Sequence, residues 1–224
     1  MIKAVLFDLD NTLIDFLTFK KETAKAAAHA MVKQGLPTDE IHAYGLIFSV
    51  YDEKGIEHQK TFYEVVKPFG LPVDDAERIQ QAAIAAYLKR KFEVLRTYPD
   101  VKATLMKLRR KGLKLGIVTD APRNKAWQRL VLTGLEKEFD VVITHDDTLE
   151  LKPHPSPFSL ALKRLGLLPG ACLFVGDNPD RDIKGAKEVG MRTCWARYGS
   201  LRKESGADYE IRRFGELVAV VEKG

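Results

Sequence analysis

The chain has 224 residues, of which 45% are hydrophobic and 30% are charged, and its formal net charge is +5. This length allows one domain, or a core with a smaller inserted domain, to bury a hydrophobic core without disulfide bonds. Basic residues are spread along the expected helices and do not cluster. The charge balance is therefore compatible with an anionic small substrate and does not require nucleic acid.

The sequence indicates a reducing compartment. Cys172 and Cys194 both lie in apolar, strand-like runs, which predicts reduced core thiols and not a disulfide or a metal site. The N-terminal residues show no signal segment, and no apolar run is long enough to cross a bilayer. We expect a cytoplasmic monomer or homodimer that binds neither membranes nor nucleic acid.

The first predicted strand carries the most informative residues. Residues 4–7 form an apolar run that ends in two carboxylates, Asp8 and Asp10, with Thr12 shortly after. Such a run predicts a strand buried on both faces, as in parallel sheets. Because ligands of open α/β sheets bind beyond the carboxyl ends of the strands, these residues lie where chemistry is expected.

The spacing of Asp8 and Asp10 places both carboxylates on the same side of an extended segment. Two carboxylates this close resist joint ionisation. A divalent cation relieves the repulsion, or one acid stays protonated and serves as a proton donor. Two solvated acids at a strand-end turn are the simpler alternative for this pair taken alone.

Residues 16–96 show helical patterns and no convincing strand. Four helices are expected there: residues 18–34, a helix capped by Thr38, residues 58–67, and a helix that starts at Asp74 with Glu77 completing a capping box. The apolar face of the second helix is predicted to carry Ile41, Tyr44, Phe48 and Tyr51. Short amphipathic helices of this kind form a small bundle, which acts as a lid over the strand ends or is a decoration without a part in binding.

From residue 97 onward, strands and helices alternate. Strands are expected at 113–118, 141–144, 172–175 and 192–196, and helices at 100–111, 123–132, 157–165, 183–189 and 214–222. This alternation predicts a Rossmann-like, doubly wound parallel sheet with right-handed crossovers. The expected organisation is an α/β core of residues 1–15 and 97–224 with an inserted all-helical cap of residues 16–96.

Polar residues follow other predicted strands as well. Thr119 and Asp120 end the second strand, where a hydroxyl can bind a phosphate oxygen. Lys152 lies between a strand and a helix start, although most lysines are solvated surface charges. The fourth strand leads into an acidic loop with Asp177 and Asp182, and such oxygen ligands suit Mg²⁺. Asp182 alternatively serves as the N-cap of the next helix.

These four segments, in this order, resemble the four motifs of the haloacid dehalogenase superfamily. The first motif is Asp8-Leu9-Asp10-Asn11-Thr12, and the others correspond to Thr119, Lys152 and the loop of Asp177 and Asp182. Asp120 stands where relatives often have Asn. The resemblance implies an α/β core with a helical cap after the first strand, and a Mg²⁺-dependent phosphatase that acts on a small phosphorylated metabolite.

The resemblance also implies roles for individual residues. Asp8 is expected to be the nucleophile that forms an aspartyl-phosphate, and Asp10 the acid that protonates the leaving oxygen and later activates water. The expected phosphate ligands are Thr119, Asp120 and Lys152. The expected Mg²⁺ ligands are Asp8, Asp10 through its backbone carbonyl, Asp177 and Asp182.

Three alternative functions share parts of this pattern. A 2-haloacid dehalogenase attacks carbon and needs no acid at position 10, so Asp10 argues against it. A phosphomutase uses the same residues and stays open. A receiver-like signalling domain combines Asp, Thr, Lys and Mg²⁺, but it places its acid pair and its phospho-acceptor on different strands and has no helical insertion. Sugar phosphates, phosphoglycolate and nucleotides all remain candidate substrates.

Overall fold

The computed structural model describes residues 1–223. The chain divides into two compact units. The core unit consists of residues 1–16 together with the chain from residue 96 onward, and the helical unit consists of residues 17–95. None of the helices among the described residues has both the length and the apolar composition needed to span a membrane.

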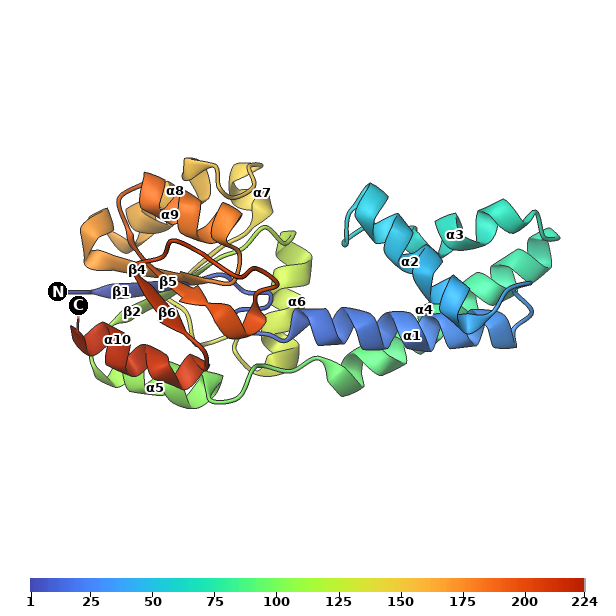
Figure 1. Cartoon of the computed structure of the whole chain (residues 1–224), viewed down its shortest axis with the longest axis horizontal. Coiled ribbons are helices and arrows are strands. Elements are labelled where there is room, and N and C mark those ends of the chain that lie inside the picture. The colour runs from blue at the N-terminus through green and yellow to red at the C-terminus, as the bar shows by residue number, and fades with distance from the viewer. Residues whose placement is uncertain (224) are drawn as a thin grey trace. The chain divides into compact units, whose positions relative to one another are not determined.

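A parallel sheet forms the centre of the core unit (Figure 1). Within residues 1–223 it has six strands in the order β3-β2-β1-β4-β5-β6. These are β1 (Ala4–Phe7), β2 (Lys114–Val118), β3 (Val141–Ile143), β4 (Cys172–Gly176), β5 (Arg192–Ala196) and β6 (Tyr209–Ile211). Along the chain, the strands are added on one side of β1 as far as β3 and then on its other side, from β4 to β6. The boundary between β1 and β4 is therefore a topological switch point, where α/β proteins bind ligands. The predicted doubly wound parallel sheet is confirmed.

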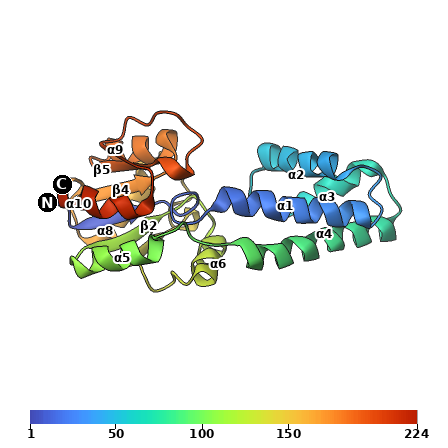
Figure 2. The same cartoon turned by 60° about the horizontal axis from the view of Figure 1, so that its bottom comes forward.

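Helices cover both faces of this sheet. The helices of the core unit are α5 (Val101–Arg110), α6 (Arg123–Thr133), α7 (His145–Thr148), α8 (Pro155–Leu165), α9 (Lys184–Glu188) and α10 (Leu217–Lys223). Figure 1 shows α8 and α9 on one face and α5 and α10 on the other. Helices α5 and α10 lie side by side in Figure 2 as well, and they contact each other. This arrangement buries both faces of β1, as its continuous apolar run predicts.

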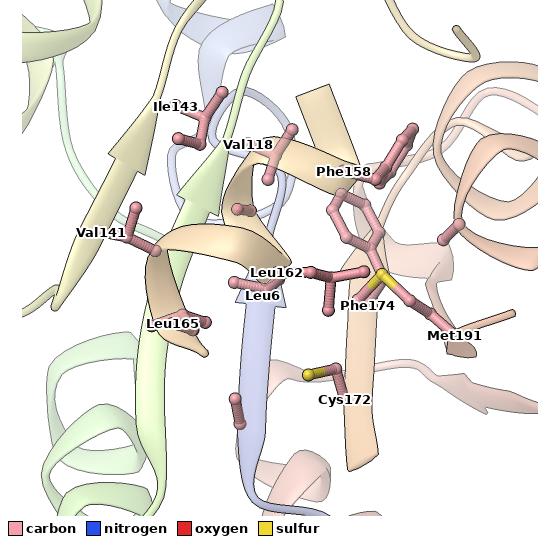
Figure 3. Packing of buried hydrophobic residues seen from close by; sticks show 13 residues of the cluster. Leu6, Val118, Val141, Ile143, Phe158, Leu162, Leu165, Cys172, Phe174 and Met191 are labelled. Carbon is pink, nitrogen blue, oxygen red and sulfur yellow. The ribbon is translucent and has the colours of Figure 1, made fainter. Parts of the chain in front are cut away.

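The core between α8 and the sheet is packed closely (Figure 3). The rings of Phe158 on α8 and Phe174 on β4 meet edge to face with centroids 5.0 Å apart. Gly116 on β2 lets its neighbours approach, because a Cβ there would lie 2.5 Å from side-chain atoms of Leu6 and Val141. Because apolar side chains fill the space between the helices and the sheet, polar side chains gather at the strand ends.

The helical unit contains α1 (Phe16–Lys33, whose first residue belongs to the core unit), α2 (Glu40–Lys54), α3 (Thr61–Val66) and α4 (Val73–Val94). Its helix starts differ from the predicted ones. Asp39, and not Thr38, caps α2 by accepting a hydrogen bond from the backbone N–H of His42 at 2.8 Å. Pro72 precedes α4 and supplies no capping oxygen, so Asp74 lies inside the first turn.

The predicted apolar face of α2 was wrong at its first residue. Ile41 is 85% exposed, whereas Ala43, Ile47, Val50 and Tyr51 are buried. Apolar residues occur around most of this helix, so periodicity does not identify the face that packs. The helical unit also buries a lysine. The ammonium of Lys20 donates to the carbonyl of Ile56 at 2.7 Å and lies 4.6 Å from the ring centroid of Tyr51.

The short helix α7 is held by a carboxylate. Asp147 accepts hydrogen bonds from the backbone N–H and the hydroxyl of Thr144 at 2.9 and 2.8 Å, which forms a capping box. Arg123 and Arg164 donate to the same carboxylate at 2.9 and 2.8 Å. Burial raises the pKa of Asp147, but the bonds from Thr144, Arg164 and Arg123 outweigh it and lower the pKa to about 2.

We expect Asp147→Asn to lower the free energy of unfolding by about 1–2 kcal/mol at neutral pH. The folded pKa lies below the ordinary value of 3.8, so this stability is fully present above that value and is lost as the pH falls through about 2. Denaturant unfolding of both proteins between neutral and acidic pH measures the difference. Glu222→Gln, which breaks an exposed ion pair with Lys111, is the control and should change little. A difference that persists undiminished at the acidic end would contradict the assignment.

Candidate active site

The strand ends bring the predicted polar residues to one edge of the sheet. Asp8 follows β1, and its backbone N–H donates to the carbonyl of Val175 on β4 at 2.9 Å. Thr119 follows β2, and its N–H donates to the carbonyl of Ile143 on β3 at 2.9 Å. These bonds extend the ladders past the strands, so the first residue after each strand is held as firmly as the strands themselves.

An acidic cluster lies at this edge. Among the described residues, Asp8, Asp177 and Asp182 each offer a carboxylate oxygen, and these atoms lie within 4.8 Å of one another. The ammonium of Lys152 lies against two of them, at 2.6 Å from Asp8 Oδ1 and 2.7 Å from Asp182 Oδ1. Lys152 is only 3% exposed. Three carboxylates beside this ammonium leave an excess of negative charge, and an all-oxygen donor set is the kind that Mg²⁺ prefers.

The pKa values reflect this crowding. Burial and the charges of Asp182 and Asp10 raise the pKa of Asp8 to about 7, although Lys152 opposes the shift. Burial and the charges of Asp8 and Asp182 likewise raise the pKa of Asp177 to about 8. Burial disfavours the ammonium of Lys152, but the two adjacent carboxylates outweigh it and raise its pKa. A divalent cation would relieve the repulsion between the carboxylates, so the residues present fit such an ion.

The acidic loop orients Asp182 toward the cluster. Asp182 Oδ2 accepts a hydrogen bond from the backbone N–H of Asn178 at 3.0 Å. The side chain of Asn178 caps the following turn, accepting from the N–H groups of Asp180 and Arg181. The alternative in which Asp182 caps a helix is therefore wrong, since the helical stretch begins earlier, at Pro179, with Asn178 as its cap, and Asp182 lies inside it. Gly176 permits the close approach, because a Cβ there would lie 2.5 Å from the carboxylate of Asp182.

The side chain of Asp10 is not one of the three carboxylates of this cluster. Its Oδ2 accepts a hydrogen bond from the guanidinium of Arg129 on α6 at 2.6 Å. The next residue, Asn11, has a positive φ of 59°. This left-handed turn is more accessible to Asn than to most side chains. Thr12 then directs its hydroxyl to Asp8 Oδ2 at 3.3 Å, so in this structure the hydroxyl donates to the carboxylate that follows β1.

The predicted phosphate ligands are also near this edge. Thr119 is buried, and its hydroxyl accepts from the N–H of Ala121 at 3.2 Å. The carboxylate of Asp120 accepts from the backbone N–H of Lys152 at 2.9 Å and from Arg181 at 3.1 Å. Asp120 thus fixes the segment that carries Lys152, and phosphate binding by Asp120 itself stays a prediction.

Several residues that support the site have no recognisable signal in the sequence. The hydroxyl of Tyr198 donates to the carbonyl of Thr12 at 2.6 Å, and its ring packs edge to face on Tyr98 with centroids 4.8 Å apart. The indole N–H of Trp195 on β5 donates to the carbonyl of Asp177 at 3.0 Å. Residues on β5 and directly after it therefore hold both the β1 loop and the β4 loop.

Gly199 makes the closest approach among the glycines of residues 1–223, since a Cβ there would collide with the carbonyl oxygen of Asn11. We expect Gly199→Ala to reduce phosphate release at least about 10-fold and stability by about 2–3 kcal/mol, because backbone must move to accept the methyl group. Phosphate-release kinetics and thermal unfolding measure the two effects. Gly170→Ala is the matched control, because its Cβ meets no atom within 4 Å. Wild-type kinetics in Gly199→Ala would refute a tight contact at this point.

Comparison with known proteins agrees with this geometry. A family model described as haloacid dehalogenase-like hydrolase matches residues 2–190. The chain is 38% identical over 229 residues to a glyceraldehyde 3-phosphate phosphatase of Methanopyrus kandleri, covering 99% of this chain and 97% of that protein. The protein of the same name from Methanocaldococcus jannaschii is 37% identical over 224 residues, with coverage of 99% and 97%.

A solved structure gives the same result. The crystal structure of a HAD phosphatase from Thermococcus onnurineus matches with a TM-score of 0.74 and 33% identity, over 98% of each chain. The family model, the full-length relatives and the parallel sheet with its acidic edge all agree. The chain belongs to the haloacid dehalogenase-like hydrolase family.

Proposed function

We propose that the protein is a Mg²⁺-dependent phosphatase that hydrolyses a small phosphorylated metabolite through an aspartyl-phosphate on Asp8. The observation that carries the proposal is the buried contact of Asp8 with Lys152 beside Asp177 and Asp182. A carboxylate nucleophile at a strand end, an adjacent ammonium and an acidic cation site are together the parts that phosphoryl transfer needs.

The residues divide the chemistry in the following way. Asp8 attacks phosphorus, and Asp10 protonates the departing oxygen and then takes a proton from the water that hydrolyses the acyl phosphate. Lys152 and Thr119 hold phosphate oxygens, with Lys152 acting as a point charge. Asp8, the backbone carbonyl of Asp10, Asp177 and Asp182 would hold Mg²⁺. When bound, the cation neutralises charge between the carboxylate and the phosphate.

The helical unit completes the proposal. We assign residues 16–96 as a cap that excludes water and contacts the non-reacting part of the substrate, which is a common role of mobile lids. The alternative of a helical decoration predicts that substitutions throughout α2 and α3 leave the KM unchanged for every substrate. We place the enzyme in the cytoplasm, as a monomer or homodimer.

The names of the relatives suggest which substrate to test first. Two full-length relatives are glyceraldehyde 3-phosphate phosphatases, so we propose a three-carbon phosphate of this kind as the leading candidate. Sugar phosphates and phosphoglycolate are the comparison substrates. A phosphomutase would isomerise a sugar phosphate without net release of inorganic phosphate, so analysis of the sugar phosphate products distinguishes it from a phosphatase.

The decisive experiment is phosphate release from an aryl phosphate by the purified protein. We expect activity with Mg²⁺, its loss on addition of a chelator, and its return with excess Mg²⁺, since the acidic cluster requires a cation to admit phosphate. Heat-treated protein at the same concentration is the control for contaminating activity. Turnover that continues unchanged in the presence of chelator would contradict the proposal.

A further inference from the structure

Arg129 is a buried charge that the roles given above do not use. It lies on α6, is 4% exposed, and donates from Nη1 to Asp10 Oδ2 at 2.6 Å. A buried guanidinium is costly unless a carboxylate and further contacts compensate it. Asp10 supplies that carboxylate, although the two residues are 119 positions apart in the sequence.

The guanidinium of Arg129 is fixed from a second direction. Its Cζ lies 4.3 Å from the ring centroid of Phe16, which is itself buried. A planar guanidinium held against a ring is oriented more firmly than a lysine ammonium would be. Arg129 therefore presents a donor of defined position to Asp10 and is more than a diffuse positive charge.

The position of Asp10 in the chain favours an anchor from another element. Asp10 follows β1 by three residues, beyond the ladder bonds that hold Asp8, and its side chain keeps 21% exposure. An acid that must reach the leaving oxygen loses much of its effect when displaced by about 1 Å. An anchor on α6, which packs in the same unit, fixes the carboxylate independently of its own loop.

We propose that Arg129 is a positioning residue that acts through Asp10, holding the carboxylate at a defined place beside the reacting phosphate. The inference rests on the proposed function, because it assumes that Asp10 serves the leaving group. The alternative is that the ion pair only ties α6 to the β1 loop and has no special effect on proton transfer.

Leaving groups distinguish these two cases. A nitrophenyl phosphate expels a stable anion that needs little protonation, whereas an alkyl phosphate such as glycerol phosphate depends on the acid. General acid catalysis contributes about 10²–10⁴-fold, so we expect Arg129→Met to lower kcat/KM for the alkyl phosphate by about 100-fold. For the nitrophenyl phosphate we expect a loss of less than about 5-fold, because kcat/KM reports the steps up to formation of the phosphoenzyme.

A double-mutant cycle adds an independent test. In the Asp10→Asn background, Arg129→Met should cause almost no further loss, since the group through which it acts is already disabled. Arg129→Lys keeps the charge but loses the planar fork, and we expect an intermediate loss on the alkyl phosphate. Arg123→Met, an exposed arginine on the same helix that pairs with Asp147, is the matched control.

The outcomes separate the inference from the proposed function. Equal losses on both substrates, or additive losses with Asp10→Asn, would overturn the positioning role of Arg129. If Asp10→Asn alone leaves alkyl phosphate turnover intact, the proposed function of Asp10 fails instead. Thermal unfolding of each variant shows which are folded, and should Arg129→Met not fold, the substrate comparison with Arg129→Lys decides the question.

Discussion

Asp8→Asn is expected to eliminate phosphate release while leaving a folded protein that is at least as stable as the wild type. An amide is not a nucleophile toward phosphorus, and loss of a covalent nucleophile reduces kcat by at least about 10⁴-fold. Stability responds in the opposite direction, because Asp8 adds to the repulsion among the carboxylates of Asp177 and Asp182. Lys152 retains Asp182 as a partner in the variant.

The experiment measures phosphate release and thermal unfolding of the same preparations, the latter in the absence of Mg²⁺. Asp180→Asn is the control, since Asp180 lies in the neighbouring acidic loop but is exposed and pairs with Arg202. It should retain turnover and melt close to the wild type. Substantial activity in Asp8→Asn would remove the nucleophile from the proposed position, and a large loss of stability would show that Asp8 is chiefly structural.

The sequence predicts the centre of this site because its signals are local. Asp8, Thr119 and Asp177 each follow an apolar run directly, and the carboxyl ends of adjacent parallel strands must share an edge. Neither fact requires knowledge of long-range contacts. The two-layered helical cover of the sheet follows from the same alternation of strands and helices.

The residues that sequence reasoning missed act over long sequence separations. Arg129 is one of 36 Lys and Arg residues, and nothing near it in the sequence distinguishes it from a surface charge. Tyr198 reaches Thr12 across 186 positions. The short edge strand β6 was also missed, because three residues are too few to show a period. Tertiary contacts alone reveal such residues.

Lys152→Met tests the charge balance of the site most severely. Removing the ammonium takes a positively charged partner away from the carboxylates of Asp8 and Asp182. Breaking a buried ion pair costs about 3–5 kcal/mol. The pKa values of Asp8 and Asp177 are raised, so protonation of these carboxylates limits the loss of stability at neutral pH. The destabilisation should therefore grow as the pH is raised. Lys163→Met on the exposed side of α8 is the matched control and should change little.

Added Mg²⁺ separates the two proposed roles of Lys152, which are charge balance and phosphate binding. The cation replaces the lost positive charge, so we expect it to raise the melting temperature of Lys152→Met more than that of the wild type. Phosphate release should nevertheless remain low, because a methionine cannot hold a phosphate oxygen. The double variant Lys152→Met with Asp182→Asn should recover part of the stability without Mg²⁺ and respond to the ion less, since it has one charge fewer in the cluster and lacks one ligand. Were Mg²⁺ to restore turnover as well as stability, Lys152 would serve only to balance charge, and the phosphate would be held by other groups.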